Sequence, residues 1–338
     1  MANAVIVGGT GQIGFAVAQR LVEAGWNVTL TSRHPAPLLP VEFRHSVADG
    51  TDAVALSAIV GTDTDLLLSC VAYGADDSQR LAGISSAVGR IAVVSTASVY
   101  CDTAGRYLDT AASTGAPRFS GLLTEQTPTV DPDSNTYSSN KIAMERALLQ
   151  QACCPVTILR PGAIHGPHSK LAREWWFVKR LLDGRQSIPL AYRGASQLQT
   201  TSTAAIANAV IQAANGQLPP IVNVADADCP TVTDIAQTIM RLMGMQAELI
   251  ALPDEPNYPP QFGATPWSIP HPMVCSTIID SAELYARAVE PAIRWLLDTV
   301  DNGNWRERLP VLASLPPDQF DYAADDRACA LPGATRIA

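Results

Sequence analysis

Short apolar runs alternate with helix-like stretches over the first two thirds of the chain. The run 4–7 is entirely apolar, and the runs 27–31, 66–71, 91–95 and 156–159 are rich in residues that favour strands. Continuous apolar runs are typical of strands that are buried on both faces of a sheet. Between them, stretches such as 15–24 and 137–151 carry apolar residues at helical spacing. This alternation predicts βαβ units, and therefore an α/β fold with a doubly wound parallel sheet.

The pattern changes after about residue 165. There we expect helices at 174–182, 204–214, 233–242 and 290–300, and one more buried strand at 221–224. Seven prolines between 253 and 272 exclude a helix or a central strand in that segment. The segment is therefore expected to be a long loop that lines a site, or a strap between domains.

We expect two domains and a tail. The larger domain covers 1–165 and about 200–225, and a smaller, mostly C-terminal α/β domain covers 166–199 and 226–310. The proline-bearing tail, 311–338, is expected to be a loosely packed C-terminal extension.

Composition excludes several classes of protein. Of 338 residues, 47% are hydrophobic and 16% are charged, which excludes a disordered chain. The net charge is −9 without a basic run, so we expect no nucleic-acid partner. No apolar stretch approaches the roughly 18–20 residues of a membrane span, and the short apolar start is not a signal peptide. The seven cysteines lack disulfide or zinc spacing, so we expect reduced thiols, no metal and a cytoplasmic location.

A glycine-rich loop follows the first predicted strand and precedes the first predicted helix. Glycines permit a sharp turn, the approach of backbone N–H groups to a pyrophosphate, and close contact between helix and strand. The helix N-terminus then attracts the phosphates. We therefore expect a Rossmann-type sheet whose larger domain binds a dinucleotide. The loop residues expected to bind it are Gly8, Gly9, Thr10, Gly11, Gln12, Ile13 and Gly14.

The end of the second strand bears on which dinucleotide is bound. NAD-binding proteins place an acidic residue there, which accepts a hydrogen bond from the ribose 2′-hydroxyl. This chain has Ser32 and Arg33 instead, a pair suited to a 2′-phosphate, so we favour NADP over NAD. The alternative is that Arg33 is a solvated loop residue. Asp49, after the third strand, lies beside the adenine or forms a simple turn.

Tyr137 and Lys141 are candidate catalytic residues. Their spacing of four places both on one face of the helix predicted at 137–151. A tyrosine needs a nearby cation to act as an acid–base near pH 7, and Lys141 can provide one while holding the nicotinamide ribose. A hydroxyl at the end of the strand 91–95 would hold the substrate oxygen, and Ser95, Thr96 and Ser98 all lie there.

Several motifs together resemble the extended short-chain dehydrogenase/reductases, the NAD-dependent epimerase/dehydratase family. They are the Gly-Gly-Thr-Gly-x-Ile-Gly loop, the Ser-Thr-x-x-Val-Tyr segment at 95–100, Tyr-x-x-x-Lys, and the segment 159–167. The resemblance implies that Thr96 is the catalytic hydroxyl. It also implies a separate substrate domain and a possible homodimer. Further cofactor contacts are expected at Ala72, Pro161, Gly162 and Ile164.

The chain departs from that family at residues that bear on its substrate. Nucleotide-sugar members carry an Asn, an Arg and an Asp where this chain has Ala163, Leu198 and Ala205. Arg193 is a possible substitute for the missing Arg. The 4,6-dehydratases require two carboxylates after the Thr, and Ala97-Ser98 provides neither. About 15 additional residues near 102–118 are expected to form a loop over the site.

Substrate contacts are expected from a small set of residues, some of which have a simpler explanation as core. His165 is a possible acid–base, with a packing role as the alternative. Trp176, Trp175, Trp267 and Tyr192 would form a pocket wall or belong to a core. The residues assigned to the substrate are Ser98, His165, Trp176 and Arg193.

These observations predict an NADP-dependent oxidoreductase, a reductase or dehydrogenase. It would transfer hydride between nicotinamide and the carbonyl or alcohol of a small, mainly apolar or weakly polar metabolite, with Tyr137 as acid–base. One alternative is a sugar or nucleotide-sugar epimerase that retains its cofactor. The other is a non-catalytic dinucleotide sensor.

Overall fold

The chain folds into two compact units. The computed structural model describes residues 1–36, 39–253, 258–279 and 282–337. Unit 1 comprises Met1–Ile164, Thr203–Ala225 and Cys275–Ala282, and unit 2 comprises His165–Ser202, Asp226–Val274 and Glu283–Ala338. Unit 2 thus extends through the tail that was expected to lie outside it.

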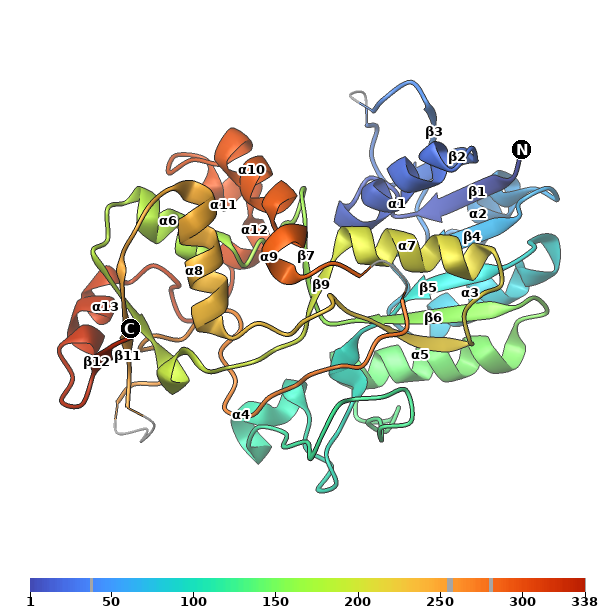
Figure 1. Cartoon of the computed structure of the whole chain (residues 1–338). Coiled ribbons are helices and arrows are strands. Elements are labelled where there is room, and N and C mark those ends of the chain that lie inside the picture. Colours follow the sequence, from blue (N-terminus) through green and yellow to red (C-terminus); the bar gives the residue numbers. More distant parts are fainter. Residues whose placement is uncertain (37–38, 254–257, 280–281, 338) are drawn as a thin grey trace. The chain divides into compact units, whose positions relative to one another are not determined.

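Unit 1 is built on a seven-stranded parallel sheet with the order β10-β6-β5-β4-β1-β2-β3 (Figure 1). The order reverses direction beside β1, so the sheet is doubly wound, and the predicted fold class is confirmed. Its strands are β1 (Asn3–Val7), β2 (Asn27–Ser32), β3 (Phe43–Val47), β4 (Leu66–Ser69), β5 (Ile91–Val94), β6 (Val156–Pro161) and β10 (Ile221–Val224).

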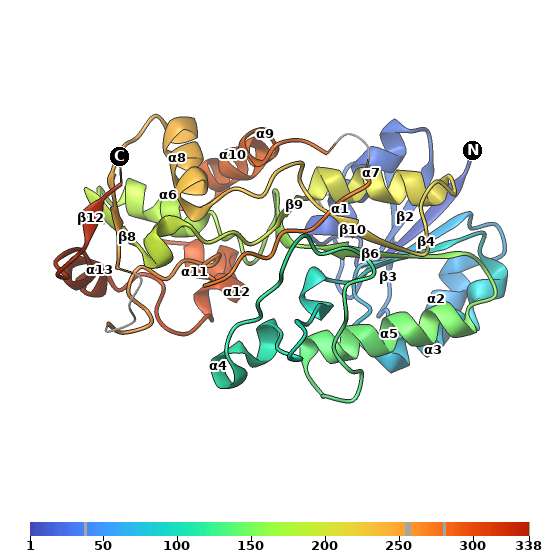
Figure 2. The same cartoon turned by 60° about the horizontal axis from the view of Figure 1, so that its bottom comes forward.

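Helices cover both faces of this sheet because successive strand residues point to opposite sides. Ala4 and Ile6 of β1 pack in one cluster with residues of α1 and α7, whereas Val5 and Val7 pack in another with residues of α2, α3 and α5. Figure 2 shows α3 and α5 side by side. The helices of unit 1 are α1 (Gln12–Glu23), α2 (Ala53–Val60), α3 (Ala75–Gly83), η1 (Ser85–Ala87), η2 (Ala97–Val99), η3 (Leu108–Thr110), α4 (Ala111–Thr114), α5 (Tyr137–Gln151) and α7 (Thr203–Ala214).

Unit 2 combines helices with a three-stranded sheet of order β12-β11-β8, in which β8 and β11 are parallel. Its strands are β8 (Ser187–Leu190), β9 (Thr200–Ser202), β11 (Glu248–Ala251) and β12 (Thr335–Arg336), and β7 (Ala163–His165) begins in unit 1. Its helices are α6 (Trp175–Leu182), η4 (Ala191–Gly194), α8 (Val232–Met243), α9 (Tyr285–Ala288), α10 (Glu290–Thr299), α11 (Trp305–Arg308), α12 (Pro310–Ala313) and α13 (Tyr322–Cys329). No helix or strand occurs in the described residues between 253 and 272.

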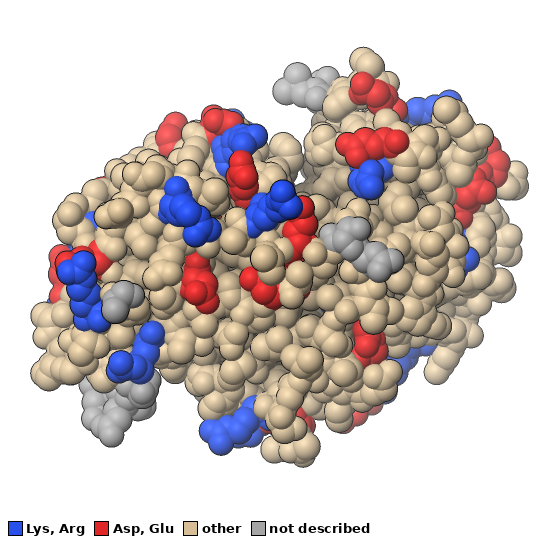
Figure 3. Space-filling model, viewed as in Figure 1, with Lys and Arg blue, Asp and Glu red and all other residues tan. Residues whose placement is uncertain are grey.

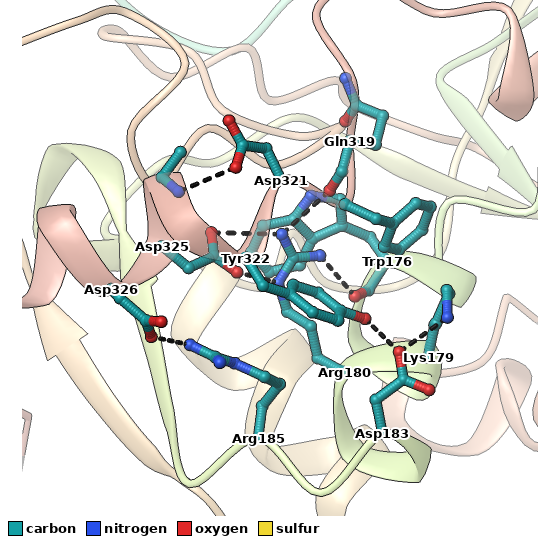
Figure 4. Close-up of polar contacts among 12 residues, drawn as sticks. Trp176, Lys179, Arg180, Asp183, Arg185, Gln319, Asp321, Tyr322, Asp325 and Asp326 are labelled. Atoms are coloured by element: carbon teal, nitrogen blue, oxygen red, sulfur yellow. Dashed lines mark hydrogen bonds and ion pairs between the residues drawn. The ribbon is translucent and has the colours of Figure 1, made fainter.

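The C-terminal tail is docked on unit 2 rather than loosely packed. The guanidinium of Arg180 in α6 lies 3.4 Å from the ring centroid of Trp176 and donates to the Asp325 carboxylate of α13, with Nε–Oδ2 at 2.9 Å (Figure 4). Its other nitrogens donate to the carbonyl oxygens of Trp176 and Gln319. The expectation of a loose extension is therefore wrong, because a buried cation on α6 requires the acceptors that the tail provides.

We expect the substitution Asp325→Ala to lower the free energy of unfolding by about 3 kcal/mol, because it leaves the buried Arg180 unpaired. Tryptophan fluorescence in denaturant suits the measurement, since five of the six tryptophans lie in unit 2. Asp326→Ala is the matched control. This substitution removes the ion pair between Asp326 and Arg185, in which the Asp326 side chain is 65% exposed. It should lower the free energy of unfolding by less than about 1 kcal/mol. Equal losses for both variants would contradict the docking role of Arg180.

Candidate active site

The candidate catalytic and cofactor residues of unit 1 gather at one edge of its sheet. Parallel strands end at a common edge, and loops from that edge form the binding site in doubly wound folds. The glycine loop follows β1, Ser32 ends β2, and Thr96 follows β5. Ala72 follows β4, and Pro161 ends β6.

The glycine loop forms a tight cradle before α1. Gly8 has a φ of +79°, and a Cβ on Gly14 would lie 2.5 Å from the carbonyl oxygen of Gly8. Larger residues would therefore push the loop away from the helix. Among the described residues, no side chain caps the N-terminus of α1 at Gly11, and its first turn has no acid. A helix start with no side-chain cap and no acid in its first turn fits a pyrophosphate, so these residues fit a dinucleotide cofactor.

The end of β2 carries polar groups on a short turn. The Ser32 hydroxyl donates to the carbonyl of His34 at 2.8 Å and lies 2.8 Å from Nε2 of His45 in β3. Arg33 is exposed. Hydrogen bonds from Thr51 and the nearby charge of Arg33 lower the pKa of Asp49. The turn therefore presents a hydroxyl and a cation, with one carboxylate close to that cation.

Three hydroxyls form a continuous chain beyond β5. Thr96 caps η2 by accepting a bond from the Ser98 N–H at 3.1 Å, and the two side-chain oxygens lie 3.0 Å apart. Ser138 of α5 donates to the Ser98 hydroxyl at 3.0 Å. Ser138 was not among the predicted site residues, although its place between Tyr137 and Lys141 is a signal that it lies close by.

Tyr137 is the first residue of α5 and is 49% exposed. The side chain of Thr136 caps the helix, which fixes this start. Partial burial raises the pKa of Tyr137 to about 12, and the nearby Tyr73 and Asp109 act in the same direction. Thr96 opposes that rise. Together these groups raise the pKa of Tyr137 rather than lower it. A catalytic role therefore requires the ammonium to act more closely on the phenol.

Lys141 is 2% exposed, and its ammonium donates to two main-chain carbonyls at the same edge. Nζ lies 2.7 Å from the oxygen of Ala72 and 2.9 Å from that of Val94. It is 5.9 Å from the ring centroid of Tyr137. Burial lowers the pKa of Lys141 to about 8, against the opposing charges of Glu145, Cys70 and Asp77.

The insertion at 102–118 folds against α5 instead of forming only a loop. Its carboxylate at Asp102 accepts bonds from the N–H groups of Ala104, Arg106 and Arg118 at 2.9–3.0 Å. Asp109 of η3 in turn accepts from the N–H of Ser138 at 2.7 Å. An acidic partner at a helix N-terminus stabilises that helix. Asp109 was missed because its contact with α5 spans 29 residues.

The remaining predicted cofactor residues flank the same strands. Pro161 is buried at the end of β6 and Gly162 follows it. Ile164 of β7 and Ile13 of α1 pack against the core cluster that contains Ala4 and Ile6. Thr10 and Gln12 are partly buried in the glycine loop.

Of the four predicted substrate residues, only Ser98 lies in unit 1. In unit 2, His165 is buried with Nε2 at 2.7 Å from the Asp226 carboxylate, and Trp176 is buried beneath Arg180. These contacts favour the alternative that both are packing residues. Arg193 is exposed on η4 with a φ of +55°. Trp175 and Trp267 are buried in unit 2, and Tyr192 is partly exposed.

The described residues contain no group of three or more His, Cys, Asp or Glu side chains that suits a metal ion. In the same part of the chain, no helix is both long and apolar enough to cross a membrane. Basic and acidic side chains are interspersed on the face shown in Figure 3, and the described residues form no continuous basic area there.

A doubly wound sheet with a glycine cradle and a Thr–Tyr–Lys set defines a dinucleotide-dependent enzyme. The model of the NAD dependent epimerase/dehydratase family matches residues 4–225, about two thirds of the sequence. The chain therefore belongs to this family and is an NAD(P)-dependent enzyme. By sequence, none of the curated proteins matches it.

Solved structures share its fold. The dTDP-glucose 4,6-dehydratase of Bacillus anthracis str. Ames, in complex with NAD, is 14% identical with a TM-score of 0.68, covering 91% of this chain and all of that one. The UDP-glucose 4-epimerase of Thermus thermophilus, also with NAD, is 15% identical with a TM-score of 0.66, covering 88% and 100%. The UDP-N-acetylglucosamine 4-epimerase of Bacillus cereus is 17% identical with a TM-score of 0.63, covering 89% and 98%. At these identities the likeness concerns the fold alone.

The carboxylate that organises the insertion should give the protein a measurable acid sensitivity. Burial raises the pKa of Asp102, but the hydrogen bonds from Arg118, Arg106 and Ala104 outweigh it and hold the pKa at about 2, below the ordinary 3.8. A depressed pKa stabilises the folded state above about pH 4, and the contribution is lost as the pH falls towards about 2.

We therefore expect Asp102→Asn to unfold more easily than the native chain at pH 7, by about 1–2 kcal/mol. The difference in the free energy of unfolding between the two proteins should narrow once the pH falls below about 4. Denaturant titrations between pH 7 and about 2.5 measure it, with the exposed Asp298→Asn as control. A difference that stays constant across this range would show that the charge of Asp102 is not what holds the insertion.

Proposed function

We propose that the protein is an NADP-dependent reductase or dehydrogenase that acts on the carbonyl or alcohol of a small metabolite. The observation that carries this proposal is the meeting of Thr96, Tyr137 and Lys141 at one edge of the sheet, beside the glycine cradle. Thr96 is close enough to Tyr137 to lower the pKa of its phenol. The ammonium of Lys141 lies within the same small region.

Each residue has a distinct task in this proposal. The hydroxyls of Thr96 and Ser98 orient the substrate oxygen, and the phenol of Tyr137 exchanges a proton with that oxygen. Lys141 holds the nicotinamide ribose and stabilises the phenolate of Tyr137 by its charge. A nicotinamide cofactor held by these residues would supply the hydride chemistry. Because the pKa of Lys141 is about 8, the charged form of its side chain predominates at pH 7.

The preference for NADP rests on the end of β2. A 2′-phosphate needs cationic and hydroxyl partners, which Arg33 and Ser32 provide, and no acidic residue ends the strand to repel it. Arg33 is exposed and has not committed its guanidinium to a buried ion pair. Asp49 would lie on the adenine side of this turn.

A sugar or nucleotide-sugar epimerase is the second candidate. The family and the epimerases of similar fold favour it. Against it, an apolar Leu198 and a buried Ala205 stand where nucleotide-sugar members carry charges. Cofactor retained through purification, with no net change in absorbance at 340 nm during turnover, would identify an epimerase.

Titration should show NADP(H) binding at least about tenfold tighter than NAD(H), which is the contribution of one charge-assisted pair. Arg33→Ala should remove most of this difference while leaving NAD(H) affinity nearly unchanged. Arg44→Ala, another exposed arginine in the same part of unit 1, is the control. Equal affinities for the two cofactors in the native protein would overturn the assignment.

Tyr137→Phe should reduce kcat by about 10²–10⁴, the range typical of general acid–base catalysis. Affinity for the cofactor should barely change, because the phenol contacts the reacting oxygen. The assay is NADPH oxidation with a panel of aldehydes, ketones and sugars, and Tyr258→Phe in unit 2 is the control. A Tyr137→Phe variant that keeps most of its activity would overturn the assignment of Tyr137 as the acid–base.

A further inference from the structure

We propose that Tyr73 is a positioning residue that holds the ammonium of Lys141 at the active edge of the sheet through the face of its ring. The inference rests on the proposed function of Lys141. Tyr73 was not among the residues predicted from the sequence, although it directly follows Ala72. Tyr73 is 53% exposed, so it contacts solvent as well as the lysine.

The backbone fixes the place of this ring. The Asp77 carboxylate of α3 accepts from the N–H of Tyr73 at 2.7 Å and from that of Gly74 at 3.1 Å. Asp77 is itself paired with Arg80 one turn later. Tyr73 therefore sits on a turn between β4 and α3 that is anchored by a charged group, and its position does not depend on a flexible loop.

The ammonium of Lys141 has three contacts at this edge. Two of its N–H donors are used by the carbonyls of Ala72 and Val94, at 2.7 and 2.9 Å. The ring centroid of Tyr73 is 4.5 Å from Nζ, well inside the roughly 6 Å range of a cation–π contact. The ring of Tyr137 lies farther away, at 5.9 Å. Tyr73 is thus the aromatic group that contacts the charge most closely.

The charges around Lys141 leave its protonation finely balanced. The groups that face it are Glu145 and Tyr137 on α5, Cys70 after β4, and Asp77 on α3. Glu145 is already paired with the buried Arg160. Burial disfavours the ammonium and lowers the pKa of Lys141 to about 8, so a further attraction to the ammonium changes its charged fraction near neutral pH.

The ring rather than the hydroxyl should carry this effect. A cation–π contact needs only the electron-rich face, which phenylalanine keeps and an aliphatic residue lacks. Tyr73→Phe and Tyr73→Leu therefore separate positioning by the ring from simple filling of space. Tyr73→Met gives a second aliphatic variant of similar bulk.

The chain allows a direct measurement because it has only three lysines, at 141, 170 and 179. Protein labelled with ¹³C-lysine gives three side-chain signals, and Lys141→Met identifies the one that belongs to Lys141. Its pH titration and the ring-current shift of its ε-protons report on the ammonium without cofactor or substrate. Lys170 and Lys179 serve as internal controls.

In the native protein and in Tyr73→Phe, we expect the Lys141 signal to titrate near pH 8 with its ε-protons shifted by the ring. In Tyr73→Leu and Tyr73→Met the midpoint should fall by about 0.5–1.5 pH units and the ring-current shift should vanish. Unchanged midpoints in both aliphatic variants would overturn the proposal, as would an equal fall in Tyr73→Phe. Because the experiment needs no turnover, its result is independent of whether Tyr137→Phe loses activity.

Discussion

A single buried ammonium sets the geometry of the candidate site. Lys141 is almost completely removed from water, and a buried charge is tolerated only when its hydrogen-bonding capacity is met. The carbonyls that meet it, at Ala72 and Val94, belong to the segments that end two neighbouring strands. Helix α5 must therefore lie against this edge of the sheet, and Tyr137, one turn before Lys141, is brought beside Thr96.

The next turn of the same helix is held by a second buried charge. The Glu145 carboxylate accepts a hydrogen bond from the hydroxyl of Ser95, which directly follows β5, and forms an ion pair with Arg160 of β6. Arg160 also donates to the hydroxyl of Tyr100 at 3.2 Å, and that hydroxyl donates to Asn223 of β10 at 2.6 Å. Breaking such a pair leaves an uncompensated charge, so α5 is tied to the sheet at two successive turns. Catalytic geometry and stability thus depend on the same helix face.

The sequence predicted well those features that local pattern determines. The helix at 137–151 has the expected limits, because its cap and its apolar spacing are both local. Six strands of the parallel sheet were located from their runs of apolar and β-branched residues, whereas β3, with the sequence FRHSV, has no such run. Tyr73 and Asp109 were missed, since their roles arise from contacts with α5 that no local pattern records. The docking of the tail was missed for the same reason: Arg180 and Asp325 are 145 residues apart.

In the proposed function the ammonium of Lys141 holds the bound cofactor, and the affinity of NADPH for the Lys141→Met variant tests this most directly. Methionine replaces the stem of the lysine and removes only its charge and donors, and circular dichroism verifies that the variant is folded. Lys170→Met, at an exposed lysine of unit 2, is the matched control. We predict that Lys141→Met weakens NADPH binding about tenfold or more, a loss of at least about 1.4 kcal/mol, while the control binds as the native chain does. Equal affinity in the folded Lys141→Met variant would contradict the account.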